Sequence, residues 1–131
     1  MIKVLFLDDE KSRWLIFHKE WNDHANIVWA KNCTEAVSLA SVGEFDVMFL
    51  DHDLGWELNP DAPEKGSDGK SGEDFARWLT TSGLKVNIIF LHSMNPVGAA
   101  NQHSLLKSAG YISKILQGAW KHSPSNLIIT R

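Results

Sequence analysis

Short apolar runs alternate with amphipathic stretches along this chain of 131 residues. Runs of four to six residues rich in Val, Ile, Leu and Phe are typical of strands buried on both faces, as in a parallel sheet. Apolar residues in the stretches between them recur at helical spacing. The predicted strands are about 3–7, 27–30, 46–50, 86–91 and 111–116, and the predicted helices are about 11–22, a segment beginning at Thr34, 73–81 and 96–108. The alternation predicts an α/β fold, a three-layer αβα sandwich around a parallel five-stranded sheet.

Glycine and proline mark several of the predicted helix ends. Gly43, Gly83 and Gly110 follow the second, third and fourth helical patterns, where glycine is a common terminator. Asn95 before Pro96 is typical of a helix start, with Asn as N-cap and Pro at the first helical position. These signals support the predicted order of strands and helices.

Two segments lack a clear regular pattern. The stretch 55–72 is polar and rich in Gly, Pro and Asp, which predicts a long loop directly after the third strand. Loops of this length are often lids or binding loops, and otherwise disordered. The tail 117–131 has no firm assignment, although 127–130 could form an extra edge strand. Nothing indicates a second domain, so a single domain over 1–131 is expected.

Acidic, hydroxyl, amide and imidazole side chains follow three of the predicted strands directly. They are Asp8 and Asp9 after the first, Asp51, His52 and Asp53 after the third, and His92, Ser93 and Asn95 after the fourth. In the common five-strand order 2-1-3-4-5, these three strands are neighbours. Ligands of open α/β sheets bind outside the carboxyl ends of the strands. The sequence therefore predicts one site that gathers these residues.

Composition and charge narrow the possible partners. The formal net charge is −3, whereas general nucleic-acid and membrane-surface binders usually carry a basic face, so no general DNA binding is expected. The single cysteine, Cys33, cannot form an internal disulfide, which fits a reducing compartment. No apolar run approaches ~18 residues, and the amino terminus leads straight into a strand pattern rather than a signal peptide. We therefore expect a cytoplasmic protein without a membrane span.

The residues at the strand ends resemble those of response-regulator receiver domains, over about residues 1–116. Asp8-Asp9 match the paired acids that hold Mg²⁺ in that family, and Asp51 matches the aspartate that accepts a phosphoryl group. His92-Ser93 occupy the region of the Ser/Thr switch, and Lys114 matches the lysine after the last strand. The resemblance implies a flavodoxin-like, receiver-like fold with sheet order 2-1-3-4-5.

The sequence also departs from that pattern. Histidines stand beside the phosphoacceptor position and after the fourth strand, Ile115 replaces a proline, and the last helix is weak or missing. These departures resemble a narrower group, the receiver-like domains proposed to process cyclic phosphates. The matching segments are 7–10 with Arg13, 51–55 and 92–98. The resemblance implies hydrolysis or transfer at a cyclic nucleotide or at an RNA-end phosphate.

Hydrolysis of a cyclic phosphodiester needs positive charge near the phosphate, a positioned or activated water, and a proton for the leaving alkoxide. A hard divalent cation on carboxylate oxygens supplies the first and lowers the pKa of a bound water. Asp8, Asp9 and Asp51 are the expected metal ligands, with Asp53 a weaker candidate. Mg²⁺ or Mn²⁺ is the expected ion.

Proton transfer is assigned to histidine, because an imidazole with a pKa of roughly 6.5 gives or takes a proton at neutral pH. His92 is the first choice for general acid and His52 the second; with Asp51 they form the predicted catalytic set. An alternative places both imidazoles on the metal, which suits Mn, Fe or Zn better than Mg. Further residues offer hydrogen bonds or positive charge to phosphate or sugar oxygens: Arg13, Ser93, Asn95 and Lys114.

Structural roles compete with these assignments. Asp8 or Asp9 could cap the first predicted helix, Asp53 could belong to a turn, and Asn95 is well explained as an N-cap. Arg13 and Lys114 could simply face solvent. A lone histidine is also more often structural than catalytic, although the shared placement of two at neighbouring strand ends favours function.

Three functions remain open, and all use the same site. The leading one is a metal-dependent phosphoesterase whose partner is a small phosphorylated ligand or RNA end, such as a cyclic nucleotide or an RNA 2′,3′-cyclic phosphate. The second is a divergent receiver that acts as a phosphorylation switch or protein-binding module. The third is a non-enzymatic cyclic-nucleotide sensor.

Overall fold

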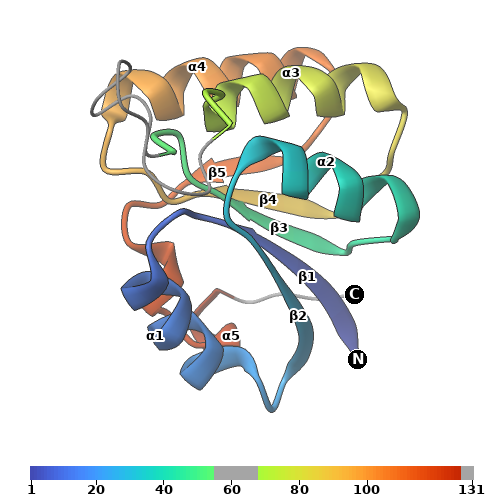
Figure 1. Ribbon diagram of the computed structural model, residues 1–131. Helices are drawn as coiled ribbons and strands as arrows, with labels where there is room; N and C mark the ends of the chain where they lie inside the picture. The colour runs from blue at the N-terminus through green and yellow to red at the C-terminus, as the bar shows by residue number, and fades with distance from the viewer. Residues whose placement is uncertain (55–67, 128–131) are drawn as a thin grey trace.

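The computed structural model describes residues 1–54 and 68–127, and its strands and helices alternate along the chain (Figure 1). The elements are β1 (Ile2–Leu7), α1 (Lys11–Trp21), β2 (Ala25–Ala30), α2 (Cys33–Val42), β3 (Val47–Leu50), α3 (Gly72–Ser82), β4 (Ile88–Leu91), α4 (Pro96–Ser108), β5 (Ser113–Ile115), the 3₁₀ helix η2 (Ala119–Lys121) and α5 (Pro124–Leu127). Most of the predicted loop 55–72 lies outside the described residues.

The strands form a five-stranded parallel sheet in the order β2-β1-β3-β4-β5, which confirms the predicted topology. The last residues of the three central strands are level with one another, since Leu7 pairs with Leu50 and Leu50 with Leu91. The ladder continues one residue further, where Asp51 N–H donates to the Leu7 carbonyl and His92 N–H to the Leu50 carbonyl. The register therefore brings the residues that follow β1, β3 and β4 side by side.

Two apolar layers cover the sheet, as predicted for a three-layer sandwich. Helices α2, α3 and α4 lie over one face, and α1 lies over the other (Figure 1). Alternate strand residues point to the two faces, so Leu5 and Leu50 join the α2–α4 core while Phe6 and Phe49 join the core under α1. Each strand is consequently buried on both sides, which explains the continuous apolar runs.

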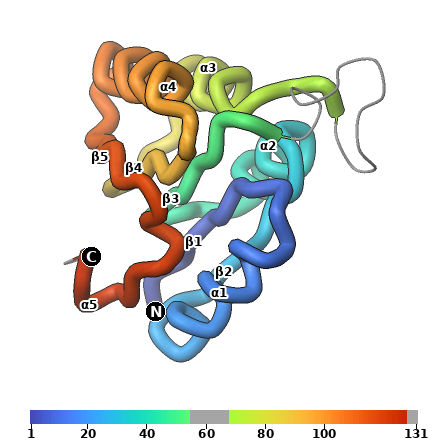
Figure 2. The backbone as a smooth tube through the Cα atoms, turned by 90° about the vertical axis from the view of Figure 1, so that its left-hand side faces the viewer, coloured from blue at the N-terminus to red at the C-terminus, as the bar shows by residue number. Residues whose placement is uncertain are grey.

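The segment after β5 packs beside α1 rather than forming another long helix (Figure 2). Trp21 of α1 donates its indole N–H to the His122 carbonyl at 2.8 Å, and Ala119 is fully buried in the same core. The predicted edge strand at 127–130 is wrong at Leu127, which ends α5; residues 128–130 lie outside the described part of the chain. Within residues 1–54 and 68–127, no helix is long and apolar enough to cross a membrane.

Several predicted boundaries were displaced by capping and by pairing. Helix α3 begins at Gly72 because Ser71 and Asp74 form a capping box, with the Ser71 hydroxyl accepting from Asp74 N–H and Asp74 accepting from Ser71 N–H. Helix α2 begins at Cys33 because the Asn32 side chain caps it. The fifth strand is shorter than its apolar pattern, because only three residues pair with β4.

Candidate functional site

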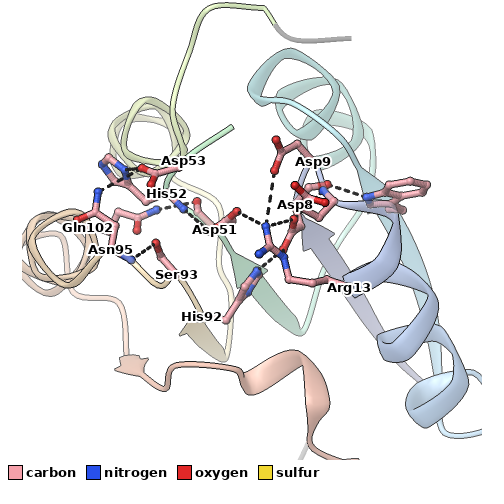
Figure 3. A network of polar contacts seen from close by, with 12 residues as sticks. Asp8, Asp9, Arg13, Asp51, His52, Asp53, His92, Ser93, Asn95 and Gln102 are labelled. Atoms are coloured by element: carbon pink, nitrogen blue, oxygen red, sulfur yellow. Dashed lines mark hydrogen bonds and ion pairs between the residues drawn. The ribbon is translucent and has the colours of Figure 1, made fainter. Parts of the chain in front are cut away.

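Three titratable side chains meet at the carboxyl ends of β1, β3 and β4 (Figure 3). Asp8, Asp51 and His92 are 0%, 4% and 1% exposed. One ligand atom from each lies within 4.8 Å of the others. The register described above produces this convergence, and it brings together residues that the sequence analysis assigned to one site.

The carboxylate of Asp8 has a hydrogen-bond donor at each of its four lone-pair positions. Oδ1 accepts from Glu10 N–H at 2.8 Å and from Arg13 Nη2 at 3.1 Å. Oδ2 accepts from Arg13 Nε at 2.9 Å and from His92 Nε2 at 2.9 Å. Burial alone would raise the pKa of Asp8, but the bonds from His92 and Arg13 outweigh it and hold the pKa below its ordinary value. Asp8 is therefore a carboxylate, not a carboxylic acid.

Asp51 and Asp9 are less well compensated. Arg13 Nη2 lies 3.4 Å from Asp51 Oδ2 and 3.8 Å from Asp9 Oδ1. Burial and the nearby charge of Asp8 raise the pKa of Asp51 to about 8 and that of Asp9 to about 6. One guanidinium does not offset three ionised acids among the described residues, so a proton or a further cation is favoured at the site.

The imidazole of His92 is stacked flat on Phe6, with centroids 5.2 Å apart and planes 4° apart. Burial lowers the pKa of His92 against the opposing effect of Asp8, so the ring is neutral at neutral pH. A neutral ring has one N–H, and the contact with a carboxylate requires it on Nε2. His92 Nδ1 then has no hydrogen-bond partner among the described residues. In this state His92 orients Asp8.

The donor set fits a hard divalent cation. Carboxylate oxygens are the ligand type that Mg²⁺ and Mn²⁺ prefer. Asp8 and Asp51 place such oxygens within 4.8 Å of one another, and Asp9 lies beside them on the shared Arg13. Direct coordination through His92 Nε2 would need that atom free of the proton that it now donates to Asp8. The alternative with imidazole on the metal stays a prediction.

His52 lies on the other side of Asp51, between α3 and α4 (Figure 3). Its Nδ1 is 2.7 Å from Asp53 Oδ1, and its Nε2 is 3.6 Å from Glu73 Oε1. The ring lies directly against Gly98, where a Cβ would stand 2.4 Å from a ring carbon. Glycine at this position lets the histidine reach its two acids.

Asn95 and Ser93 form hydrogen bonds at the start of α4, next to His52 and Asp53. Asn95 Oδ1 accepts from Gly98 N–H at 3.0 Å, which confirms the predicted N-cap. Its Nδ2 donates to Asp53 Oδ1 at 3.2 Å. Ser93, which is 4% exposed, accepts from Asn95 N–H at 2.9 Å. A role for either side chain toward phosphate stays a prediction.

The structure bears on two of the structural alternatives, an exposed Lys114 and a helix cap at Asp8 or Asp9. Lys114 is exposed on β5, level with Phe90, and the ion pair that Asp51 makes within the described chain is with Arg13. Neither Asp8 nor Asp9 is the N-cap of α1, because Glu10 holds that position without a side-chain cap bond. Asp8 nevertheless accepts from the Glu10 N–H.

Two residues of the site were not predicted. Gln102 is fully buried in α4 and donates to the Asp51 carbonyl at 3.2 Å. An amide at helical spacing with the buried Ala99 and Leu106 was a readable signal. Trp29 donates its indole N–H to the Asp8 carbonyl at 2.8 Å. That bond depends on the pairing of β1 with β2, which sequence periodicity does not encode.

A cavity of about 430 Å³ lies at the opposite end of the strands. Its lining includes Phe45, Asp46, Lys85 and Val86, at the entries to β3 and β4. The acid and histidine residues described above do not line it. The concentration of charge at the carboxyl ends, rather than this hollow, marks the candidate site.

The fold and the paired acids define a receiver domain of the response-regulator type. The sequence matches the family described as "Cyclic-phosphate processing Receiver domain" over residues 3–108, so the chain belongs to that family. This confirms the resemblance found from sequence. No curated protein matches the chain.

Solved response regulators share the fold. A two-component response regulator from Clostridium difficile is 15% identical, with a TM-score of 0.65, covering 97% of this chain and 89% of its own. A Burkholderia pseudomallei response regulator with a phosphorylated aspartic acid, calcium ion and citrate is 16% identical, with a TM-score of 0.65 and coverage of 97% and 65%. Thermotoga maritima TrrA in complex with Mg²⁺-BeF is 21% identical, with a TM-score of 0.61 and coverage of 87% for both chains.

Proposed function

We propose that this protein is a cation-dependent receiver in which Asp51 takes up a phosphoryl group. The observation that carries the proposal is the position of Asp51, at the end of β3 beside Asp8 and within 3.4 Å of Arg13. Asp8, Asp9 and Asp51 would hold the divalent cation, which would offset phosphate charge when bound. The magnesium and phosphoaspartate named for the Thermotoga and Burkholderia relatives support the same assignment.

Asp51 is the nucleophile of the proposed reaction. A carboxylate oxygen bonds to phosphorus while the bond from phosphorus to the donor's leaving oxygen breaks, so a small acyl phosphate such as acetyl phosphate leaves as acetate. The product is a phosphoaspartyl group on Asp51. Arg13 offers a planar guanidinium to the phosphoryl oxygens, the role expected of it from sequence.

Incubation with acetyl phosphate and Mg²⁺ tests this proposal. Intact-mass measurement should show one added phosphoryl group, absent when Mg²⁺ is chelated and absent in Asp51→Asn. Asp23→Asn, an exposed aspartate between α1 and β2, is the matched control and should label like wild type. An unlabelled wild-type protein with Mg²⁺ present would overturn the proposal.

A second candidate is hydrolysis of a cyclic phosphodiester, in a cyclic nucleotide or an RNA 2′,3′-cyclic phosphate end. Two histidines with carboxylate partners flank Asp51, which a phosphorylation switch does not need. The description of the family also names cyclic phosphates. In this candidate His92 or His52 supplies the proton to the leaving alkoxide, and Ser93 and Asn95 bind phosphate or sugar oxygens.

Chromatography of a cyclic-nucleotide panel with Mg²⁺ or Mn²⁺ separates the candidates. Ring opening that is lost in both His92→Ala and Asp51→Asn would establish the phosphoesterase and its substrate class. Turnover that survives both substitutions would remove this site assignment. Tight binding across the panel without turnover would instead identify a sensor of cyclic nucleotides.

A further inference from the structure

Arg13 occupies the space between the acids on which a cation would bind. Its Nε and Nη2 contact the two oxygens of Asp8 at 2.9 and 3.1 Å, and Nη2 also lies 3.4 Å from Asp51. The side chain is 25% exposed, whereas those of Asp8 and Asp51 are 0% and 6% exposed. Figure 3 shows the guanidinium between the two carboxylates. The protein thus carries its own positive charge at this position.

A cation and Arg13 compete for the same lone pairs. Asp8 has four, and donors from Glu10, His92 and Arg13 fill all of them. The Glu10 donor is backbone N–H, and the ring of His92 is fully packed on Phe6, so neither moves readily. Arg13 is a long side chain reaching from α1 with one end toward solvent. The donor that must leave to admit a cation is therefore Arg13.

A displaced guanidinium needs a new anion. Every ion pair found for Arg13 in the described chain is with Asp8, Asp9 or Asp51, which are the residues a cation would take over. A phosphoryl group bound beside Asp51 lies within the same reach and matches the planar donor fork. The Arg13 side chain would thus leave the acids and bind the phosphate in one movement.

We propose that Arg13 is an exchangeable counter-ion that couples cation binding to phosphate binding. Arg13 opposes the cation while phosphate is absent, and contacts the phosphate once the cation has displaced it. Each ligand then strengthens the other, because each favours the arrangement in which Arg13 has left Asp8. The proposal rests on the phosphate site proposed above and adds how that site is regulated.

Equilibrium titration with Mg²⁺, followed by tryptophan fluorescence, provides the test, because Trp29 bonds to the Asp8 carbonyl. Titrations run with and without inorganic phosphate on wild type, Arg13→Ala and Arg13→Lys. Without phosphate, Arg13→Ala should bind Mg²⁺ about tenfold more tightly than wild type. Phosphate should tighten Mg²⁺ binding about tenfold in wild type and hardly at all in Arg13→Ala, in line with typical coupling between sites.

The control variants make the result specific. Arg77→Ala removes an exposed arginine that pairs with Glu73 on α3, and should titrate like wild type. Arg13→Lys keeps the charge without the fork and should fall between wild type and Arg13→Ala. It also serves as the test variant if Arg13→Ala does not fold, with a reduced effect of phosphate as the expected result.

Equal or weaker Mg²⁺ binding in Arg13→Ala, or an unchanged effect of phosphate, would overturn the coupling. That outcome together with acetyl phosphate labelling of Asp51 would leave the proposed function standing. Coupling without any label would overturn the phosphoacceptor and keep the role of Arg13. The two proposals therefore fail separately.

Discussion

The two sides of Asp51 hold similar residues in different ways. On one side Asp8 and His92 are buried at the ends of β1 and β4, His92 bonds to Asp8, and Arg13 is the counter-ion of Asp8 and Asp51. On the other, His52 is held between Asp53 and the α3 residue Glu73, beside the first turn of α4. Each side pairs an imidazole with a carboxylate at the end of a strand. On the first side the counter-ion, Arg13, also pairs with Asp51.

The Asp8 side is suited to bind a ligand, whereas the His52 side supports the surrounding structure. Around Asp8 the acids are close together in a poorly solvated setting, so their charge is costly until a cation arrives. Around His52 the polar groups bond to one another and, through Asn95, to the start of α4. We therefore expect changes near Asp8 to alter binding and changes near His52 to alter stability.

Asp8→Asn should have the largest effect. The substitution removes a central carboxylate ligand, and loss of even indirect partners typically weakens metal binding 10–100-fold, so Mg²⁺ affinity should fall by about 100-fold or more. The same titration on Asp53→Asn should change affinity by less than about tenfold, below the range for indirect partners. Equal losses in the two variants would contradict the division between the sides.

Gly98→Val should destabilise the His52 side. A side chain there meets the His52 ring, so overpacking should lower the free energy of unfolding by about 1–3 kcal/mol, measured by urea denaturation. Asn101→Ala, on the exposed face of α4, is the control. Adding His52→Ala should recover part of the loss, and a double variant no more stable than Gly98→Val would locate the strain elsewhere.

The pH dependence of stability sharpens the comparison on the Asp8 side. Burial and the charge of Asp8 raise the pKa of Asp51 to about 8, so the folded protein holds a proton that the unfolded chain has released. This contribution is fully present below the unfolded pKa and is lost as pH rises through about 8. Without cation, stability should fall by about 1 kcal/mol between roughly pH 7 and 8.5. Urea denaturation should show the fall in wild type and not in Asp51→Asn; equal slopes would contradict it.

Trp29→Phe should have the smallest effect. Phenylalanine keeps much of the stacking on Trp14, whose ring lies 5.4 Å away, but cannot donate to the Asp8 carbonyl. The expected loss is about 0.5–1 kcal/mol in unfolding free energy, with Mg²⁺ affinity reduced only a few-fold. Calorimetric titration suits this variant because the fluorescence reporter is altered. An unchanged affinity would show that the indole bond does not position Asp8.

The architecture was predictable because buried parallel strands have a simple hydrophobic pattern in the sequence. Burial on both faces requires the continuous apolar runs at 4–7, 47–50 and 88–91, and the sheet order then follows from a small set of allowed connections. The polar residue after each run was therefore placed correctly beside its neighbours. The displaced starts of α2 and α3 came from side-chain caps at Asn32 and Ser71, which periodicity overlooks.

The partners within the site were less predictable. Sequence grouped His52 with His92, but side-chain direction alternates and helix packing differs, so the two rings lie on opposite sides of Asp51. The sequence also left open whether Lys114 faces solvent, because its spacing from Gly110 does not determine where the strand begins to pair. Such contacts depend on how closely the helices and strands pack together, which the hydrophobic pattern of the sequence does not determine.

His92 stacks on Phe6, and Phe6 stacks on Phe17 with ring centroids 4.4 Å apart. The same rings therefore serve both the packing of the core and the orientation of the site. A change at Phe6 that a typical core would tolerate also tilts the imidazole that orients Asp8. The ring that fills the core under α1 thus also sets the angle of a site residue, so a substitution at Phe6 should change cation affinity as well as the free energy of unfolding.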